Sequence, residues 1–486
     1  MPKTPDRFQL AGGPSISRLV CGLWQVADIE KDGDLFDPEH GADLLADYVE
    51  AGFDTFDMAD HYGSAELIAG RLMARSDAGR RPVAFTKWCP EPGPMTADIV
   101  RRGVQQRLDR LGVERVDLLQ LHWWTFEHPG WLDALHLMAD LKAQGLIGAL
   151  GVTNFDAAHL RVALADGVPL ATNQVSFSLV DRRAEGELSA LCRETGVTLL
   201  VYGTLCGGFL SDSWLGKEEP AAPTDWSRGK YKRFIDAAGG WAVLQGLLRA
   251  ARKIADRHGV SISNVASRWV LEHDAVAAAI VGARLGEREH RADNLKVFGF
   301  SLDVEDRAGL ADAFAATAPI PGDCGDEYRR PPYLTASGDL SHHLGAIAPV
   351  YRAEPMPGRP HRLRVSSGSV WEPLAGYSRA VRVKDTIRVS GTTATHGNDR
   401  CVAPGDAGAQ TTYILDKIAA SIAALGGTMH DVVRTRIYLR DASQWEPVSR
   451  AHGRFFGEIK PSNTLVEAGD LVGDYEVEIE AEAVVG

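Results

Sequence analysis

Over about the first 300 residues, short runs of apolar and β-branched residues alternate with longer stretches in which apolar residues recur with a 3.6-residue period. The short runs predict strands and the periodic stretches predict amphipathic helices. Several periodic stretches end at a glycine, which is typical of a helix C-terminus. Eight strands alternating with helices predict a (β/α)8 TIM barrel. A doubly wound sheet is the alternative, but no GxGxxG motif opens the first βα unit. The strands are expected to begin near residues 18, 53, 82, 116, 146, 170, 197 and 276, and the glycines stand at positions 52, 112, 145, 167 and 196.

Three segments depart from this repeat. Residues 8–17 contain a Gly-Gly pair between two short apolar runs, which predicts a hairpin. Residues 205–240, rich in Gly, Pro, Trp and charge, form a long connection after the seventh strand. Loops of this length inside a compact domain usually serve as lids. Residues 303–316 predict an additional amphipathic helix outside the barrel.

The pattern changes after residue 317. Residues 318–361 contain eight prolines and few periodic runs, which predicts a linker. Residues 362–486 then mix strand-like runs with two helical stretches, at 408–425 and 444–457, and predict a small α+β domain. The expected organisation is therefore a barrel over residues 1–317, a Pro/Gly-rich linker over 318–361 and a second domain over 362–486. In the second domain, strands are expected at 362–371, 379–391, 432–439, 464–467 and 475–485.

The composition of the chain excludes several classes of protein. A net charge of −13 argues against a nucleic-acid-binding face and against an anionic membrane surface. No run of apolar residues reaches the ~18 that a membrane-spanning helix needs. The six scattered cysteines, without a CxxC pair, indicate a reduced, cytoplasmic location. Cys21, Cys89 and Cys206 fall near strand ends, but we interpret them as small buried apolar side chains and expect no metal.

Polar residues gather at the ends of three successive predicted strands. Asp57 and Tyr62 follow the second strand, Lys87 ends the third and His122 ends the fourth. A parallel barrel carries its chemistry at this face. Burying a lysine or an aspartate alone is costly, so the two are expected to pair. An Asp–Lys pair beside a tyrosine makes the phenol a better proton donor.

These four positions resemble the catalytic residues of the aldo-keto reductase family. The resemblance implies a barrel that reduces an aldehyde or ketone to an alcohol with hydride from a nicotinamide cofactor. Tyr62 would then protonate the carbonyl oxygen. Lys87, held by Asp57, would assist it, and His122 would orient the carbonyl.

The resemblance extends to the cofactor site. The sequence Gly151-Val152-Thr153-Asn154-Phe155 follows the fifth strand, with Thr153 where the family usually has Ser. Residues expected to hold the nicotinamide end are Thr153, Asn154 and Gln174 for the carboxamide, Tyr202 for stacking on the ring, and Gly203 to Leu205 for close approach of the backbone to the pyrophosphate.

Arg284, His290 and Asn294 resemble the adenosine end of the family's site. A basic side chain there would pair with the 2′-phosphate, so the resemblance implies NADPH in preference to NADH. Arg284 is the candidate, while His290 stands where the family often has Arg.

Several tryptophans stand just beyond strand ends. Trp24, Trp88 and Trp123 are therefore expected to form an aromatic wall for the substrate, with packing against loops as the alternative.

Residues 362–486 resemble the RidA/YjgF family through Gly376-Tyr377-Ser378, Ser390-Gly391-Thr392 and Val477-Glu478-Ile479. Active members of that family hydrolyse imines and bind the substrate carboxylate with an arginine. Asn463 stands at that position here and lacks the charged fork of an arginine. The resemblance also implies a chorismate-mutase-like fold and a homotrimer.

The leading hypothesis is thus an NADPH-dependent aldo-keto reductase with a RidA-like domain for trimerisation or ligand binding. Reduction of an imine or iminium substrate is the alternative chemistry. A third interpretation is an NADPH-binding redox sensor with slow turnover. The expected partner is a small carbonyl or imine compound.

Overall fold

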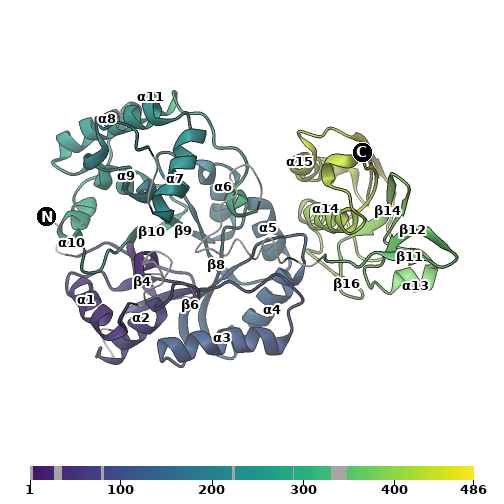
Figure 1. The fold of residues 1–486 in the computed structure, drawn as a ribbon, viewed down its shortest axis with the longest axis horizontal. Coiled ribbons are helices and arrows are strands. Elements are labelled where there is room, and N and C mark those ends of the chain that lie inside the picture. Colours follow the sequence, from purple (N-terminus) through teal and green to yellow (C-terminus); the bar gives the residue numbers. More distant parts are fainter. Residues whose placement is uncertain are drawn as a thin grey trace.

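The computed structural model describes residues 4–26, 36–77, 81–221, 225–287, 289–329, 347 and 349–486. The chain folds into two parts, and Figure 1 shows the larger N-terminal part, purple to teal, beside the smaller C-terminal part, green to yellow. Within the described ranges, no helix is long and apolar enough to cross a lipid bilayer.

Eight parallel strands close into a barrel in the N-terminal part, which confirms the predicted (β/α)8 fold. The strands neighbour one another in chain order, and the last pairs with the first to close the barrel. Each begins close to its expected position. They are β3 (Leu19–Gly22), β4 (Thr55–Asp57), β5 (Val83–Trp88), β6 (Val116–His122), β7 (Ile147–Thr153), β8 (Leu170–Ser176), β9 (Thr198–Tyr202) and β10 (Val276–Gly282).

Helices follow the strands and surround the barrel (Figure 1). All five glycines that the sequence placed at helix ends have a positive φ, a conformation that costs glycine little. Gly112 and Gly196 are themselves the left-handed C-caps of their helices. The helices between β3 and β9 are α1 (Pro38–Glu50), α2 (Ala65–Ala74), α3 (Ala97–Leu111), α4 (Gly130–Ala143), α5 (Ala157–Ala165) and α6 (Glu187–Thr195).

The predicted hairpin consists of β1 (Arg7–Gln9) and β2 (Ser15–Ser17) and precedes the barrel. Leu10 and Ile16 in it are fully buried, in one cluster with Phe85 and other side chains from inside the barrel. The hairpin therefore closes the N-terminal end of the barrel and leaves the C-terminal end for a functional site.

The long connection after β9 is not a plain loop. It contains two short 3-10 turns and a helix, α7 (Trp226–Ala237), before α8 (Trp241–His258) and α9 (Ile262–Leu271) lead to β10. Asp225 caps α7 by accepting a hydrogen bond from the backbone N–H of Arg228. The expected helix outside the barrel is present as α11 (Val304–Phe314), after the short α10 (Arg291–Asn294).

The C-terminal part is a seven-stranded sheet packed against helices, in agreement with the predicted α+β domain. Its order is β11-β12-β13-β14-β19-β17-β18, antiparallel except for the β17–β18 pair. The strands are β11 (Glu354–Met356), β12 (Arg359–Val365), β13 (Ala380–Val383), β14 (Thr386–Thr393), β17 (Val432–Leu439), β18 (Ser462–Glu467) and β19 (Val477–Val484). A separate pair comprises β15 (Thr395–His396) and β16 (Arg400–Cys401), and the helices are α13 (Trp371–Ala375), α14 (Ala407–Ala424) and α15 (Trp445–Phe456).

The segment expected to be a linker, 318–361, is in contact with both parts where the structure describes it. Residues 318–329 run over the barrel and include a 3-10 turn at Asp326–Tyr328. At the other end, β11 and the start of β12 already belong to the C-terminal sheet. Prolines 355 and 360 lie in these outer strands, at or next to the sheet edge, where a missing N–H is tolerated. The sequence pattern missed these strands for that reason.

Helix α14 lies between the barrel and the C-terminal sheet (Figure 1). It packs on β14 and β19 on one side and on α5 on the other. Its apolar and small residues are buried nearly all round, which fits a helix covered on two sides.

Charged contacts accompany this packing. They join His159 to Asp416, His396 to Asp133, Arg400 to Asp166, Arg161 to Asp406, and Arg454 to both Glu187 and Asp323.

Candidate active site

The four residues predicted to be catalytic come together at the C-terminal end of the barrel. Lys87, near the end of β5, donates hydrogen bonds to Asp57 Oδ2 at 2.8 Å and to the backbone oxygen of Met58 at 2.9 Å. Its ammonium lies 5.0 Å from the centre of the Tyr62 ring. The Asp57–Lys87 pair is almost completely buried, so each charge depends on the other.

Asp57 has a second partner. Gln174, on β8, donates a hydrogen bond to Asp57 Oδ1 at 2.7 Å. Both carboxylate oxygens are therefore occupied, and the orientation of the carboxylate is fixed. Gln174 was expected to bind the cofactor and lines the cavity, but it also holds Asp57.

His122 ends β6 and is buried. Its ring stacks on Trp124 with 4.9 Å between centroids and meets the edge of Tyr328 at 5.4 Å. Burial, together with the nearby charge of Arg329, lowers the pKa of His122 well below its usual value. The imidazole is therefore neutral at pH 7 and can donate one hydrogen bond.

A cavity of about 480 Å³ opens over these residues. All four catalytic candidates line it, as do all nine residues expected to hold the cofactor. The predicted residues in its wall are Trp24, Asp57, Tyr62, Lys87, His122, Thr153, Asn154, Gln174, Tyr202, Gly203, Leu205, Arg284, His290 and Asn294.

The nicotinamide end of this cavity fits the group that the sequence implies. Thr153 Oγ1 is buried and has no hydrogen-bond partner among the described residues, so a carboxamide could satisfy it. Tyr202 donates a hydrogen bond to Asn154 Oδ1 at 2.7 Å, which orients that amide. Gly203 has a positive φ of 70°, and a Cβ there would lie 2.6 Å from the hydroxyl of Tyr231. A larger residue would therefore disturb this wall.

Arg284, His290 and Asn294 line the far end of the same cavity. The guanidinium of Arg284 lies 3.6 Å from Glu287 and is one-third exposed. A loose, exposed ion pair of this kind holds the arginine only weakly, so it remains available for an anionic group.

Of the three tryptophans expected to form an aromatic wall, one lines the cavity. Trp24 lines the cavity and meets the ring of Tyr62 edge-on at 5.0 Å. Trp88 instead packs against α3, where a Cβ on Gly103 would lie 2.5 Å from its indole. Trp123 is fully buried next to His128. Neither indole lines the cavity, because side chains alternate along a strand and the neighbours of the inward-pointing Lys87 and His122 point outward.

Several cavity-lining residues have no counterpart in the sequence prediction, among them a lysine and a tyrosine. Lys230, on α7, and Tyr328, in the expected linker, both line the cavity. The Gly- and Trp-rich connection gave a weak signal for the first. Nothing in the local pattern singled out the second, because its position depends on how residues 318–329 cross the barrel.

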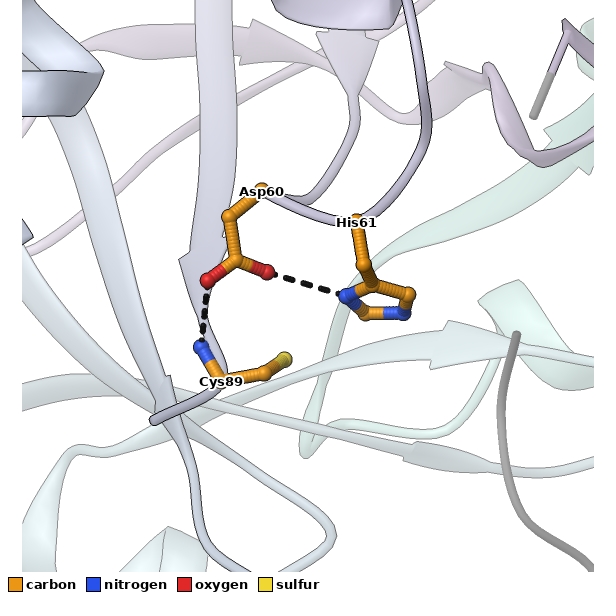
Figure 2. Close-up of side chains that lie close together, drawn as sticks. All are labelled: Asp60, His61 and Cys89. Atoms are coloured by element: carbon orange, nitrogen blue, oxygen red, sulfur yellow. Dashed lines mark hydrogen bonds and ion pairs between the residues drawn. The ribbon is translucent and has the colours of Figure 1, made fainter. Parts of the chain in front are cut away.

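Asp60, His61 and Cys89 lie beside the candidate catalytic residues, with candidate ligand atoms within 4.8 Å of one another (Figure 2). Figure 2 shows the two oxygens of Asp60 directed at His61 Nδ1 and at the backbone N–H of Cys89, at 2.9 and 2.8 Å. Arg107 approaches the same carboxylate at 3.6 Å.

These contacts favour a structural role for the cluster. Burial would raise the pKa of Asp60, but His61, Arg107 and the Cys89 amide lower it to about 2. Burial also raises the pKa of the Cys89 thiol well above its usual value, which opposes the thiolate that a metal requires. The network fixes the loop that carries Tyr62. Cys21 and Cys206 are buried and do not belong to this cluster.

Comparison with known proteins agrees with this geometry. Residues 18–313 match the model of the aldo/keto reductase family, and the chain belongs to that family. Residues 368–485 match the model described as Endoribonuclease L-PSP, so the C-terminal domain is RidA/YjgF-like, as the resemblance indicated.

Relatives of known name match the barrel. Pyridoxal reductase from Arabidopsis thaliana is 28% identical over 54% of this chain and 73% of its own length. The NADH-specific methylglyoxal reductase of Escherichia coli is 26% identical over 60% of this chain and 93% of its own. Among solved structures, a glycerol dehydrogenase from Gluconobacter oxydans has a TM-score of 0.55 and 25% identity, covering 65% of this chain and 98% of that one.

Proposed function

We propose that this aldo-keto reductase reduces an aldehyde or ketone to the alcohol, with Tyr62 as the proton donor. The observation that carries the proposal is the buried Asp57–Lys87 pair, with its ammonium 5.0 Å from the Tyr62 ring and neutral His122 in the same cavity wall. When bound, a nicotinamide cofactor supplies the hydride.

The chain's own residues perform the remaining steps. His122, neutral because it is buried, donates a hydrogen bond to the carbonyl oxygen and orients it. Tyr62 transfers its phenolic proton to that oxygen as negative charge develops there. The Lys87 ammonium stabilises the phenolate that remains, and Asp57 keeps the ammonium charged and in place.

The direct test is oxidation of NADPH and NADH by the full-length protein with a panel of aldehydes, ketones and cyclic imines. Methylglyoxal and pyridoxal belong in the panel because two relatives are named as reductases of these compounds. We expect turnover of one or more carbonyl compounds. Turnover of the imines alone would replace this proposal with imine reduction, and binding of NADPH without any turnover would favour a redox sensor.

We further propose NADPH as the preferred cofactor. Arg284 lies at the far end of the cavity, and its exposed ion pair with Glu287 leaves the guanidinium available for a 2′-phosphate. Because one relative is NADH-specific, the preference has to be measured on this chain.

For the C-terminal domain we propose a role in homotrimerisation. Helix α14 covers one face of the sheet, while the other face carries Glu478, Glu480 and Glu482 and the exposed Val433 and Val466. Trimerisation through this open face would leave the barrels outside a central core. Light scattering by the full-length protein tests the assembly.

Imine hydrolysis is not proposed for this domain. Asn463 donates a hydrogen bond to Thr435 at 2.9 Å and offers no charge to a carboxylate. Arg436 is paired with Glu480 at 3.1 Å. Arg379 is buried and donates to the backbone oxygen of Gly391. Arg379 and Arg436 therefore each already have a partner.

A further inference from the structure

Lys230 is a cation inside the cavity that the reduction described above does not use. Its ammonium lies 4.7 Å from the centre of the Tyr202 ring and 4.5 Å from that of Tyr328, and it donates a hydrogen bond to the Tyr328 hydroxyl. It has no carboxylate within ion-pair distance in the part of the chain that the structure describes. Two residues away, Lys232 pairs with both Glu219 and Asp236.

The carboxylate next to Tyr328 in the sequence, that of Glu327, already has a cationic partner. Glu327 accepts a charge-assisted hydrogen bond from Arg183 at 2.9 Å, and both side chains are buried. Among the described residues, the Lys230 ammonium contacts the Tyr328 hydroxyl and the faces of aromatic rings, each ring worth about 0.5–2 kcal/mol, and no carboxylate. A partly buried ammonium in such a setting is complementary to an anion.

Tyr328 connects this ammonium to the catalytic centre. Its ring meets His122 edge-on at 5.4 Å and Trp124 at 5.9 Å. The neighbouring Arg329 fixes the segment by donating hydrogen bonds to the backbone oxygens of Asn154 at 2.6 Å and Trp123 at 3.0 Å. The Tyr328 oxygen accepts from Lys230, so its own proton can be donated to a ligand.

We propose that Lys230 and Tyr328 bind an anionic group of the substrate, so that the substrate is an aldehyde or ketone that also carries a carboxylate or a phosphate. This inference rests on the proposed carbonyl reduction. Because a single ring, Tyr328, separates the ammonium from His122, the anion and the carbonyl of one small molecule can be bound at the same time.

A phosphate of the cofactor is the other possible anion. The groups expected to hold the adenosine end, Arg284, His290 and Asn294, come from β10 and the residues after it, whereas Lys230 contacts Tyr202 and Tyr328. The 2′-phosphate is therefore expected away from Lys230, whereas the pyrophosphate, expected at Gly203 to Leu205 next to Tyr202, is the cofactor group that the test distinguishes from a substrate anion.

The test compares matched substrates in the full-length protein. 4-Formylbenzoate is paired with 4-methylbenzaldehyde, and glyceraldehyde 3-phosphate with glyceraldehyde. For Lys230→Met we expect kcat/KM to fall roughly ten- to a hundredfold for the charged member of a pair, the usual cost of losing a charge-assisted contact. The neutral member should change little. Tyr328→Phe should show the same selectivity with a smaller loss.

Lys232→Met is the matched control, because it removes the same charge from the same helix where carboxylates already neutralise it. It should leave both members of each pair unchanged. Thermal unfolding checks that every variant is folded.

Three outcomes would overturn the inference. Equal losses for charged and neutral substrates would mean that Lys230 only shapes the cavity. Weaker NADPH binding in Lys230→Met, measured by tryptophan fluorescence, with unchanged discrimination would assign the anion to the cofactor. If the wild-type protein reduces none of these carbonyls, binding of 4-formylbenzoate is measured by calorimetry. Equal affinity in the wild type and in Lys230→Met would rule out the anion site. Weaker binding by Lys230→Met would support the anion site and reject only the proposed reduction.

Discussion

His159, on α5, lies between two carboxylates at the boundary of the domains. Its Nδ1 is 2.7 Å from Asp156 and its Nε2 is 3.0 Å from Asp416, which belongs to α14. Burial alone would lower the pKa of His159, but the two carboxylates raise it from 6.5 to about 9. The histidine is therefore a buried imidazolium that joins the barrel to the C-terminal domain.

We predict that His159→Gln destabilises the protein by roughly 3 kcal/mol at pH 6. The estimate follows from the pKa difference, because each tenfold change in proton affinity corresponds to about 1.36 kcal/mol. Since the folded-state pKa is raised, this stability is fully present below about pH 6.5 and is lost as the pH rises through about 9. The variant should be close to the wild type near pH 10 and far less stable near pH 6.

Urea unfolding near pH 6, 8 and 10 measures this effect, with limited proteolysis to report separation of the domains. His136→Gln is the control. His136 also pairs with an aspartate whose side chain is buried, Asp166, but the His136 side chain itself is about one-third exposed. In the variant, Arg400 and the backbone N–H of Ala403 would still bind the Asp166 carboxylate. Loss of the His136 imidazole should lower the free energy of unfolding by about 1 kcal/mol or less. A His159→Gln variant whose stability parallels the wild type at all three pH values would refute the reasoning.

Three further predictions concern the proposed function. Tyr62→Phe should lower carbonyl turnover by about 10²–10⁴-fold with little change in cofactor affinity, because it removes only the proton donor; retention of more than half the rate would exclude that role. Arg284→Ala should weaken NADPH binding about ten- to a hundredfold and NADH binding little, as measured by fluorescence titration; equal weakening would show that Arg284 does not contact the 2′-phosphate. Val466→Glu, on the exposed sheet face, should convert a trimer of the 52.6-kDa chain into monomers in light scattering, whereas Val304→Glu on α11 should not; a monomeric wild type would reject the trimer.

Elements that follow from local spacing were predicted from the sequence. The eight barrel strands and the helix-ending glycines were read from short-range periodicity and backbone preference, which act within a few residues. In the C-terminal domain the same reasoning placed α14 and β17 almost at their observed bounds. The proximity of Asp57, Tyr62, Lys87 and His122 was predictable too, because strand ends in a parallel barrel meet at one face; their catalytic role stays a prediction.

Contacts between segments far apart in the chain could not be predicted from the sequence pattern. Strand register decided that Trp88 and Trp123 point away from the cavity. The path of residues 318–329 brought Tyr328 onto His122 and Lys230. Packing of α14 on α5 placed Asp416 beside His159. None of these pairs has a local signal, because the free energy that forms each one comes from burial and charge pairing after the chain has folded.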